Sequence, residues 1–124
     1  MPSDETPEMS LVRDCQARYH PNIETCVSYI SGYRLSMTIH EAVRSTLERV
    51  GYESLTGEAV KEGFDKIHNF ETGLSGPISF DDHPNDRTSV ETYRMLTWDV
   101  DNGRERFITD WFKGISLRDL GYIE

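Results

Sequence analysis

Apolar side chains recur at helical spacing from the start of the chain. Met9, Val12 and Tyr19 follow such a pattern, and Thr6 before a proline and an acid supplies an N-cap, a first-turn proline and an early negative charge. The pattern stops at residues 20–22, where a proline disfavours the helical conformation of the residue before it. The sequence therefore predicts a first helix over residues 7–19, preceded by a disordered tail at residues 1–5.

A longer apolar stripe predicts a second helix over residues 27–50, with Gly51 as its C-terminal stop. The stripe consists of Leu35, Ile39, Ala42, Val43, Thr46, Leu47 and Val50. Gly32 lies early in this segment, where it costs helix propensity but permits close approach of backbone or ligand. Thr56 then caps a predicted third helix, roughly residues 57–68, whose apolar face includes Ala59, Phe64 and Ile67.

The pattern changes after residues 73–76, which contain two glycines. Residues 77–80 are typical of a short strand, and residues 81–89 of a polar loop. Residues 90–100 and 104–111 are rich in Thr, Tyr, Val and Trp and are separated by Asp101-Asn102-Gly103, which predicts a hairpin. Residues 113–124 show no firm pattern and are interpreted as a tail or a short helix. The expected fold class is α/β, with about three helices before a short strand and a C-terminal β-hairpin.

Composition narrows the classes of function. Apolar residues make up 36% of the 124-residue chain, which is enough for a modest core. The net charge of -9 repels phosphate backbones and anionic membrane surfaces, so we expect no nucleic-acid partner. No run approaches the roughly 18 apolar residues of a membrane helix, so we expect no membrane insertion.

No motif indicates an enzyme, a cofactor or a metal. Phosphate-binding glycine loops and serine-nucleophile elbows are absent, and the His40-Glu41 pair has Arg44 where a zinc-protease motif needs a second histidine. The acidic loop of Asp81, Asp82 and His83 with Asp86 does not have the spacing of an EF-hand calcium loop, which favours a solvated turn. Cys15 and Cys26 are interpreted as buried or half-buried free thiols, although a disulfide between them stays conceivable.

Several short phrases occur in an order that resembles a known family. They are Tyr19-His20-Pro21-Asn22, Ser28-Tyr29-Ile30-Ser31-Gly32-Tyr33, Glu41-Ala42-Val43, Leu55-Thr56-Gly57-Glu58-Ala59-Val60, Asn69-Phe70-Glu71-Thr72-Gly73-Leu74-Ser75-Gly76-Pro77-Ile78-Ser79-Phe80, Asp82-His83, Asn102-Gly103 and Thr109-Asp110-Trp111. Together they resemble the C-terminal part of the type I periplasmic binding proteins, of the leucine/isoleucine/valine-binding branch, over residues 6–112. In physical terms Gly73 and Gly76 allow a chain reversal, Pro77 pre-sets an extended entry, and Trp111 is an apolar anchor.

The resemblance implies a fragment of an ABC-transporter solute-binding protein, with no covalent chemistry. The intact form would hold a branched-chain amino acid, an amide or a urea-type molecule between two lobes and deliver it to an ABC permease. Most of the ligand site lies in earlier segments of such proteins. The resemblance places one candidate ligand-binding residue here, Tyr29 at the start of the long helix, with Ser28 as the alternative one position earlier. The alternative is that Tyr29 is a core or lobe-interface aromatic, because aromatics at helix starts more often serve packing than recognition.

Two other interpretations remain open. The chain is interpretable as a stand-alone interaction module that forms homo-oligomers through an exposed apolar surface, or as a ligand-sensing regulatory domain of the same ancestry. The intact family member would be periplasmic or extracellular. Because the N-terminus lacks the basic and apolar regions of a secretory signal, the chain as given is expected to remain cytoplasmic.

Overall fold

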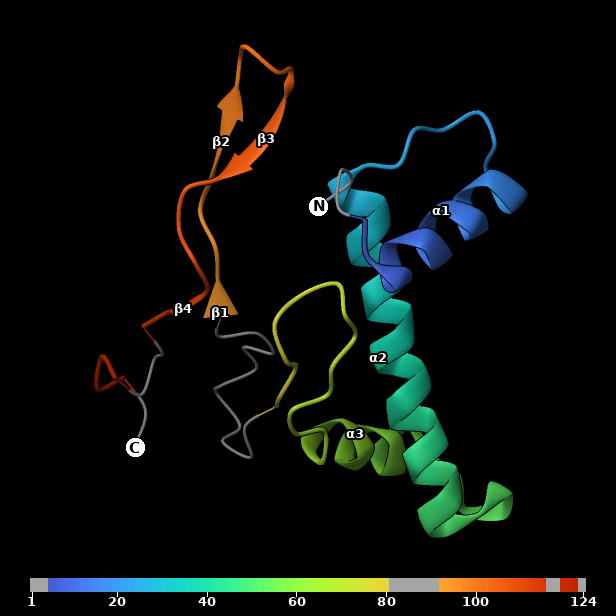
Figure 1. The fold of residues 1–124 in the computed structure, drawn as a ribbon. Helices are drawn as coiled ribbons and strands as arrows, with labels where there is room; N and C mark the ends of the chain where they lie inside the picture. The colour runs from blue at the N-terminus through green and yellow to red at the C-terminus, as the bar shows by residue number, and fades with distance from the viewer. Residues whose placement is uncertain (1–4, 81–91, 116–118, 123–124) are drawn as a thin grey trace.

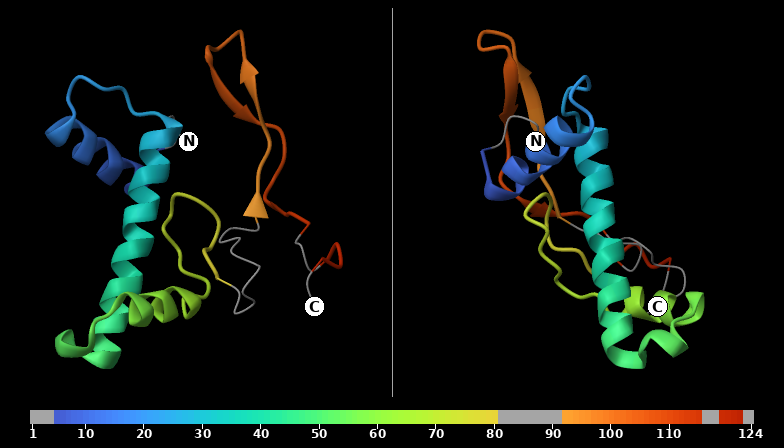
Figure 2. Two further views of the ribbon diagram at one scale, coloured as in Figure 1. Left: turned by 180° about the vertical axis from the view of Figure 1, so that it is seen from behind. Right: turned by 90° about the vertical axis from the view of Figure 1, so that its right-hand side faces the viewer.

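The computed structural model describes residues 5–80, 92–115 and 119–122. One long helix, α2 (Val27–Val50), forms the spine of the molecule. The helix α1 (Pro7–Tyr19) lies against its N-terminal part and α3 (Gly57–Asp65) crosses its C-terminal part, while a β ribbon stands to one side (Figures 1 and 2). The described chain is thus a mixed helix-and-strand protein with three α-helices and small antiparallel sheets.

The first helix begins and ends where its sequence signals predict. The Thr6 hydroxyl accepts a hydrogen bond from the Met9 backbone N–H at 3.2 Å, and Pro7 occupies the first turn, where its missing N–H costs nothing. Met9 and Val12 are buried against Ile30 of α2, with Tyr29, Tyr33 and Leu74 packed around them. We call this group the upper cluster.

The second helix has the predicted bounds but a different buried face. Gly51 ends it at φ 75° and donates its N–H to Leu47 at 2.9 Å. Its buried residues are Ile30, Thr38, Ala42 and Thr46. The predicted stripe is therefore wrong at Leu35 and Ile39, which are 56% and 45% exposed. The buried face carries small side chains because α3 approaches it closely.

That approach depends on Gly63 of α3. A Cβ atom at this position would collide with the Thr46 hydroxyl and lie 2.8 Å from the Ala42 carbonyl oxygen. The Thr56 hydroxyl caps the helix by accepting from the Ala59 N–H at 3.1 Å, as predicted. The helix ends at Asp65 rather than near His68, and a short 3₁₀ turn, η1 (Tyr52–Ser54), precedes it.

Residues 67–80 fold back over α2 and α3 to form a second cluster. Ala42, Ile67 and Ile78 are buried there, and the partly buried Phe64, Phe70 and Phe80 pack around them. Phe70 and Ile78 exchange two backbone hydrogen bonds of 2.9 Å. The strand predicted at residues 77–80 is reduced to this single bridge, because the described structure places no further strand beside it. We call this group the lower cluster.

The C-terminal hairpin is confirmed, with shorter strands than predicted. Strands β2 (Leu96–Asp99) and β3 (Arg104–Phe107) pair antiparallel, and β1 (Thr92–Tyr93) pairs with β4 (Phe112–Lys113). Lys113, expected in the tail, belongs to β4, and residues 119–122 form a turn rather than a helix. The loop predicted at residues 81–89 lies outside the described residues. None of the described helices has both the length and the apolar character that a membrane crossing requires.

Candidate functional site

An open hollow lies between the second half of α2 and the residues that follow α3. Glu41, Ser45 and Arg49 succeed one another at four-residue spacing, so they form one row on the α2 surface. The opposite wall consists of Lys66, Ile67 and residues 68–71, with Gly63 between the two helices. The volume of the hollow is about 330 Å³, within the lower range of small-molecule sites.

Arg49 is held in place at the edge of this hollow. Its Nη2 donates to the Ala59 carbonyl at 3.1 Å, and its Nη1 lies 3.2 Å from the Glu62 carboxylate. Both partners belong to α3, so the close crossing at Gly63 also determines where the guanidinium lies.

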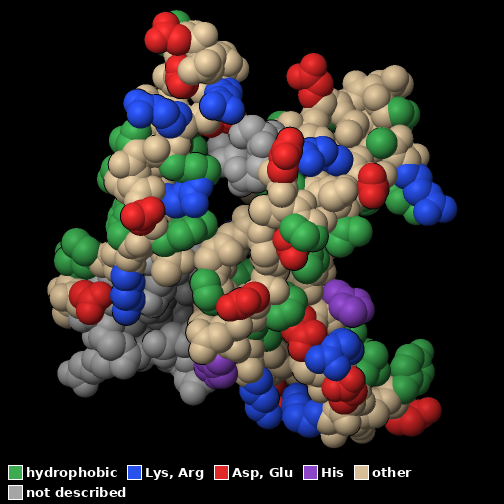
Figure 3. All heavy atoms as spheres, viewed as in Figure 1, with side chains coloured by type: hydrophobic (Ala, Val, Ile, Leu, Met, Phe, Trp, Pro, Cys, Tyr) green, Lys and Arg blue, Asp and Glu red, His purple; other side chains and the backbone are tan. Residues whose placement is uncertain are grey.

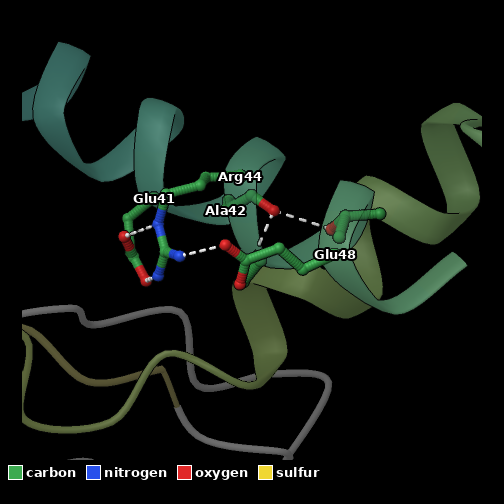
Figure 4. Close-up of polar contacts among 6 residues, drawn as sticks. Glu41, Ala42, Arg44 and Glu48 are labelled. Carbon is green, nitrogen blue, oxygen red and sulfur yellow. Dashed lines mark hydrogen bonds and ion pairs between the residues drawn. The ribbon is translucent and has the colours of Figure 1, made fainter. Parts of the chain in front are cut away.

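Glu41 is held by an ion-pair network along α2. The Arg44 guanidinium donates to both Glu41 carboxylate oxygens at 2.7 and 2.9 Å and to Glu48 at 2.5 Å (Figure 4). The hydrogen bond from Arg44 lowers the pKa of Glu41 below its usual range, and the same contacts raise the pKa of Arg44. Glu41 therefore carries a negative charge at neutral pH. In place of the second histidine of a zinc-protease motif, Arg44 forms ion pairs with Glu41 and Glu48 on the surface of α2.

The charges around the hollow balance. Arg49 and Lys66 contribute two positive charges, and Glu41 and Glu71 contribute two negative ones. Within the described residues the side chains of Lys66, His68 and Glu71 are exposed and make no polar contact. The lining is therefore neutral as a whole, but it carries separated charges, of which Lys66 and Glu71 have no hydrogen-bond partner among the described residues. Such a wall is complementary to a small dipolar molecule.

The candidate Tyr29 lies elsewhere. Its ring meets His20 edge to face at 5.9 Å, and its hydroxyl donates to the Cys15 sulfur at 3.8 Å. Loss of hydration and then the Cys15 thiol raise the pKa of the Tyr29 hydroxyl. Twelve residues of helix separate Tyr29 from Glu41, a distance of about 18 Å at the rise of an α-helix. Ser28 is exposed on the adjoining turn.

The structure thus joins Tyr29 to the upper cluster and not to the hollow. Cys15 and Cys26 are both free thiols, as predicted, but only Cys15 is half-buried; the prediction of burial is wrong for Cys26, which is exposed.

A second hollow, of about 380 Å³, lies between the loop at residues 71–77 and the β ribbon, where Thr92 and Trp111 line it. Trp111 directly precedes β4 and is 55% exposed, so its indole is only partly covered by the protein. The loop itself is fixed at Gly73, whose φ of 70° suits glycine, and at Gly76, where a Cβ atom would collide with the Thr92 hydroxyl.

No group of three or more His, Cys, Asp or Glu side chains capable of holding a metal occurs within residues 5–80, 92–115 and 119–122. The acidic loop of Asp81, Asp82, His83 and Asp86 lies outside those ranges. Comparison of the chain with protein-family models, with curated proteins and with solved structures found no match.

Proposed function

We propose that this chain is the C-terminal part of a non-enzymatic solute-binding protein of the leucine/isoleucine/valine-binding type. The intact protein binds a small amino-acid-like ligand, of the branched-chain amino acid, amide or urea type, and delivers it to an ABC permease. The mechanism is closure of two lobes around the ligand, driven by the contacts that the ligand gains in the closed state. This chain contributes one wall of the binding region.

The observation that carries the proposal is the hollow with balanced lining charges beside residues 69–80, the longest of the phrases that resemble the family. That phrase is packed onto α2 and α3 through Phe70 and Ile78. Lys66 offers donors to a carboxylate, beside an Arg49 guanidinium that already bonds to α3, and Glu71 offers acceptors to an ammonium group. A free amino acid presents both groups a few ångströms apart.

The hollow is open, so binding to the chain alone is expected to be weak. A dissociation constant of about 10 mM corresponds to only about -2.7 kcal/mol. At a ligand concentration equal to that constant, the free energy of unfolding rises by about 0.4 kcal/mol. A thermal-shift screen with amino acids should therefore show almost no change, and a method that detects weak binding residue by residue is required.

The test is an NMR titration of the isotope-labelled chain with leucine, acetamide, urea and isocaproate, the last of which lacks the ammonium group. We expect leucine to perturb the amides of residues 41–49 and 63–71 and isocaproate to perturb them less. Lys66→Gln and Glu71→Gln should each raise the leucine dissociation constant about fivefold, since an exposed ion pair contributes up to about 1 kcal/mol.

Lys61→Gln and Glu53→Gln serve as matched controls, because both side chains are exposed and neither lines a hollow described above. They should leave the constant unchanged. Perturbations scattered over the whole chain, or equal effects of the site and control variants, would contradict the proposal.

A second candidate, the stand-alone interaction module, is favoured by one specific observation. Half-exposed aromatic and aliphatic side chains are concentrated in the C-terminal ribbon, where Trp98 is 58% and Trp111 55% exposed. Exposed apolar patches of this kind commonly mark a surface that another protein covers.

A further inference from the structure

The ribbon of residues 92–113, which we call the arm, has one apolar face. In the antiparallel ladder Leu96 lies opposite Phe107 and Trp98 opposite Glu105, so these four side chains project to the same side. Arg94 belongs to this side by alternation. We call this surface the Trp98 face. The other side carries Thr97 and Arg106, which are polar.

None of the helices described above covers the Trp98 face. Leu96 is 42% and Trp98 58% exposed, and the β2–β3 end of the arm stands apart from the three helices (Figures 1 and 2). Green patches follow the arm in the space-filling view (Figure 3). A two-stranded ribbon by itself is only marginally stable in water, and it needs a further layer on its apolar face. The described structure supplies no such layer.

The chain as a whole exposes more surface than a compact protein of its mass. The accessible surface of the chain is 8842 Å², whereas a compact protein of this mass exposes about 6800 Å². The excess of roughly 2000 Å² exceeds the approximately 800 Å² that each partner buries in a standard interface. A dimer interface therefore fits within the surplus.

Charge distinguishes the arm from the rest of the molecule. The arm contains four cations, Arg94, Arg104, Arg106 and Lys113, and four acids, Asp99, Asp101, Glu105 and Asp110. It is neutral, while the whole chain carries -9. Two copies repel each other wherever their acidic surfaces meet, so the arm is the surface through which they approach at least cost.

The charges on the Trp98 face are also self-complementary. Arg94 lies at the base, with its guanidinium carbon 3.1 Å from the centre of the Phe107 ring and 5.2 Å from that of Trp111. Glu105 lies nearer the turn. The Arg94 Nε itself is buried and has no hydrogen-bond partner among the described residues, so a pairing across the axis uses the terminal nitrogens of the guanidinium. A two-fold axis that sets two arms antiparallel would bring the Glu105 end of one arm to the Arg94 end of the other.

We propose that this chain forms a homodimer in which two arms pack antiparallel, Trp98 face against Trp98 face. The apolar centre is formed by Leu96 and Trp98 from each copy, beside Phe107 with its covering Arg94 guanidinium, and Arg94–Glu105 pairs close both ends. This association requires no ligand and is independent of the solute-binding proposal.

The test is sedimentation equilibrium of the full chain across a hundredfold range of protein concentration. We expect a concentration-dependent rise from the 14.3 kDa monomer to twice that mass. Trp98→Lys should remain monomeric, because it places two unpaired ammonium groups in the apolar centre. Tyr52→Lys is the control, since Tyr52 is 81% exposed on η1 and its replacement should leave the dimer intact.

A second measurement does not depend on how well Trp98→Lys folds. In Trp111→Phe, Trp98 is the only tryptophan, and its fluorescence should shift to longer wavelength as dilution separates the arms. A wild-type chain that stays monomeric, larger aggregates without a dimer, a dimer that survives Trp98→Lys, or an emission maximum that does not change on dilution would each overturn the proposal.

Discussion

At the scale of single residues, Gly63 determines the distance between α2 and α3. Its hydrogen faces the Thr46 hydroxyl, which donates to the Ala42 carbonyl at 2.7 Å. We predict that Gly63→Ala lowers the free energy of unfolding by about 1 to 2 kcal/mol, because overpacking costs more than the gain in helix propensity returns. Urea denaturation followed by far-UV circular dichroism measures this change.

Gly57→Ala is the matched control, since Gly57 lies in the same helix and has no atom within 4 Å of the position that its Cβ would occupy. There the substitution should leave stability unchanged or raise it by up to about 1 kcal/mol. If both variants behaved alike, the close crossing at Gly63 would be refuted.

Only some of the residues that line the hollow can be predicted from the sequence. The row Glu41, Ser45 and Arg49 follows from helical spacing once α2 is predicted. Lys66 and Glu71 have no such signal, because tertiary packing of residues 67–80 brings them to α2. Tyr29, singled out by family resemblance, lies against His20 instead, and its ligand-binding role stays a prediction.

At the scale of elements, the helices were predictable because their end signals are local. The Thr6 and Thr56 hydroxyls bond to N–H groups three residues on, whatever the rest of the chain does. Elements that need a distant partner were less predictable. Residues 77–80 make one bridge instead of a strand, and the outward position of Leu35 and Ile39 depends on which side α3 packs.

The hairpin turn gives an element-scale prediction about pH. The Asp99 carboxylate accepts hydrogen bonds from the Asn102 side chain at 2.9 Å and its backbone N–H at 3.2 Å, which lowers the pKa of Asp99. Because the pKa of Asp99 is lowered on folding, its carboxylate stabilises the turn at pH values above the ordinary aspartate pKa of about 3.9. This stabilisation is lost as pH falls through the pKa of the folded state. We therefore predict that the hairpin loosens in acid.

NMR shifts of the β2 and β3 amides, followed from neutral to acidic pH, would reveal this loosening. Asp99→Asn should abolish the pH dependence assigned to the turn. Asp101→Asn should retain it, because its side chain makes no hydrogen bond among the described residues. Identical titration curves for both variants would show that Asp99 is not responsible.

At the scale of the whole molecule, the core consists of two small clusters joined by the loop at residues 71–77. Leu74 of this loop packs on the upper cluster and Ile78, which follows it, is buried in the lower one. Only six apolar side chains are buried among the described residues: Met9, Val12, Ile30, Ala42, Ile67 and Ile78. Because so little apolar surface is removed from water, the folded state should be sensitive to weak, distributed forces.

Electrostatic self-repulsion is the distributed force that the sequence makes largest. With 22 acidic and 13 basic side chains, the compact state gathers like charges that the unfolded chain spreads out. Salt screens them, since the Debye length falls from about 30 Å at 0.01 M to about 3 Å at 1 M. We predict that raising NaCl across this range, at fixed protein concentration, raises Tm by about 3 to 5 °C, equivalent to about 1 kcal/mol.

The triple variant Asp14→Asn, Glu24→Gln, Glu53→Gln, at three exposed positions, should unfold at a higher Tm in low salt and respond less to NaCl. A Tm that falls with salt in both proteins would mean that local ion pairs such as Arg44 with Glu41 outweigh the net charge.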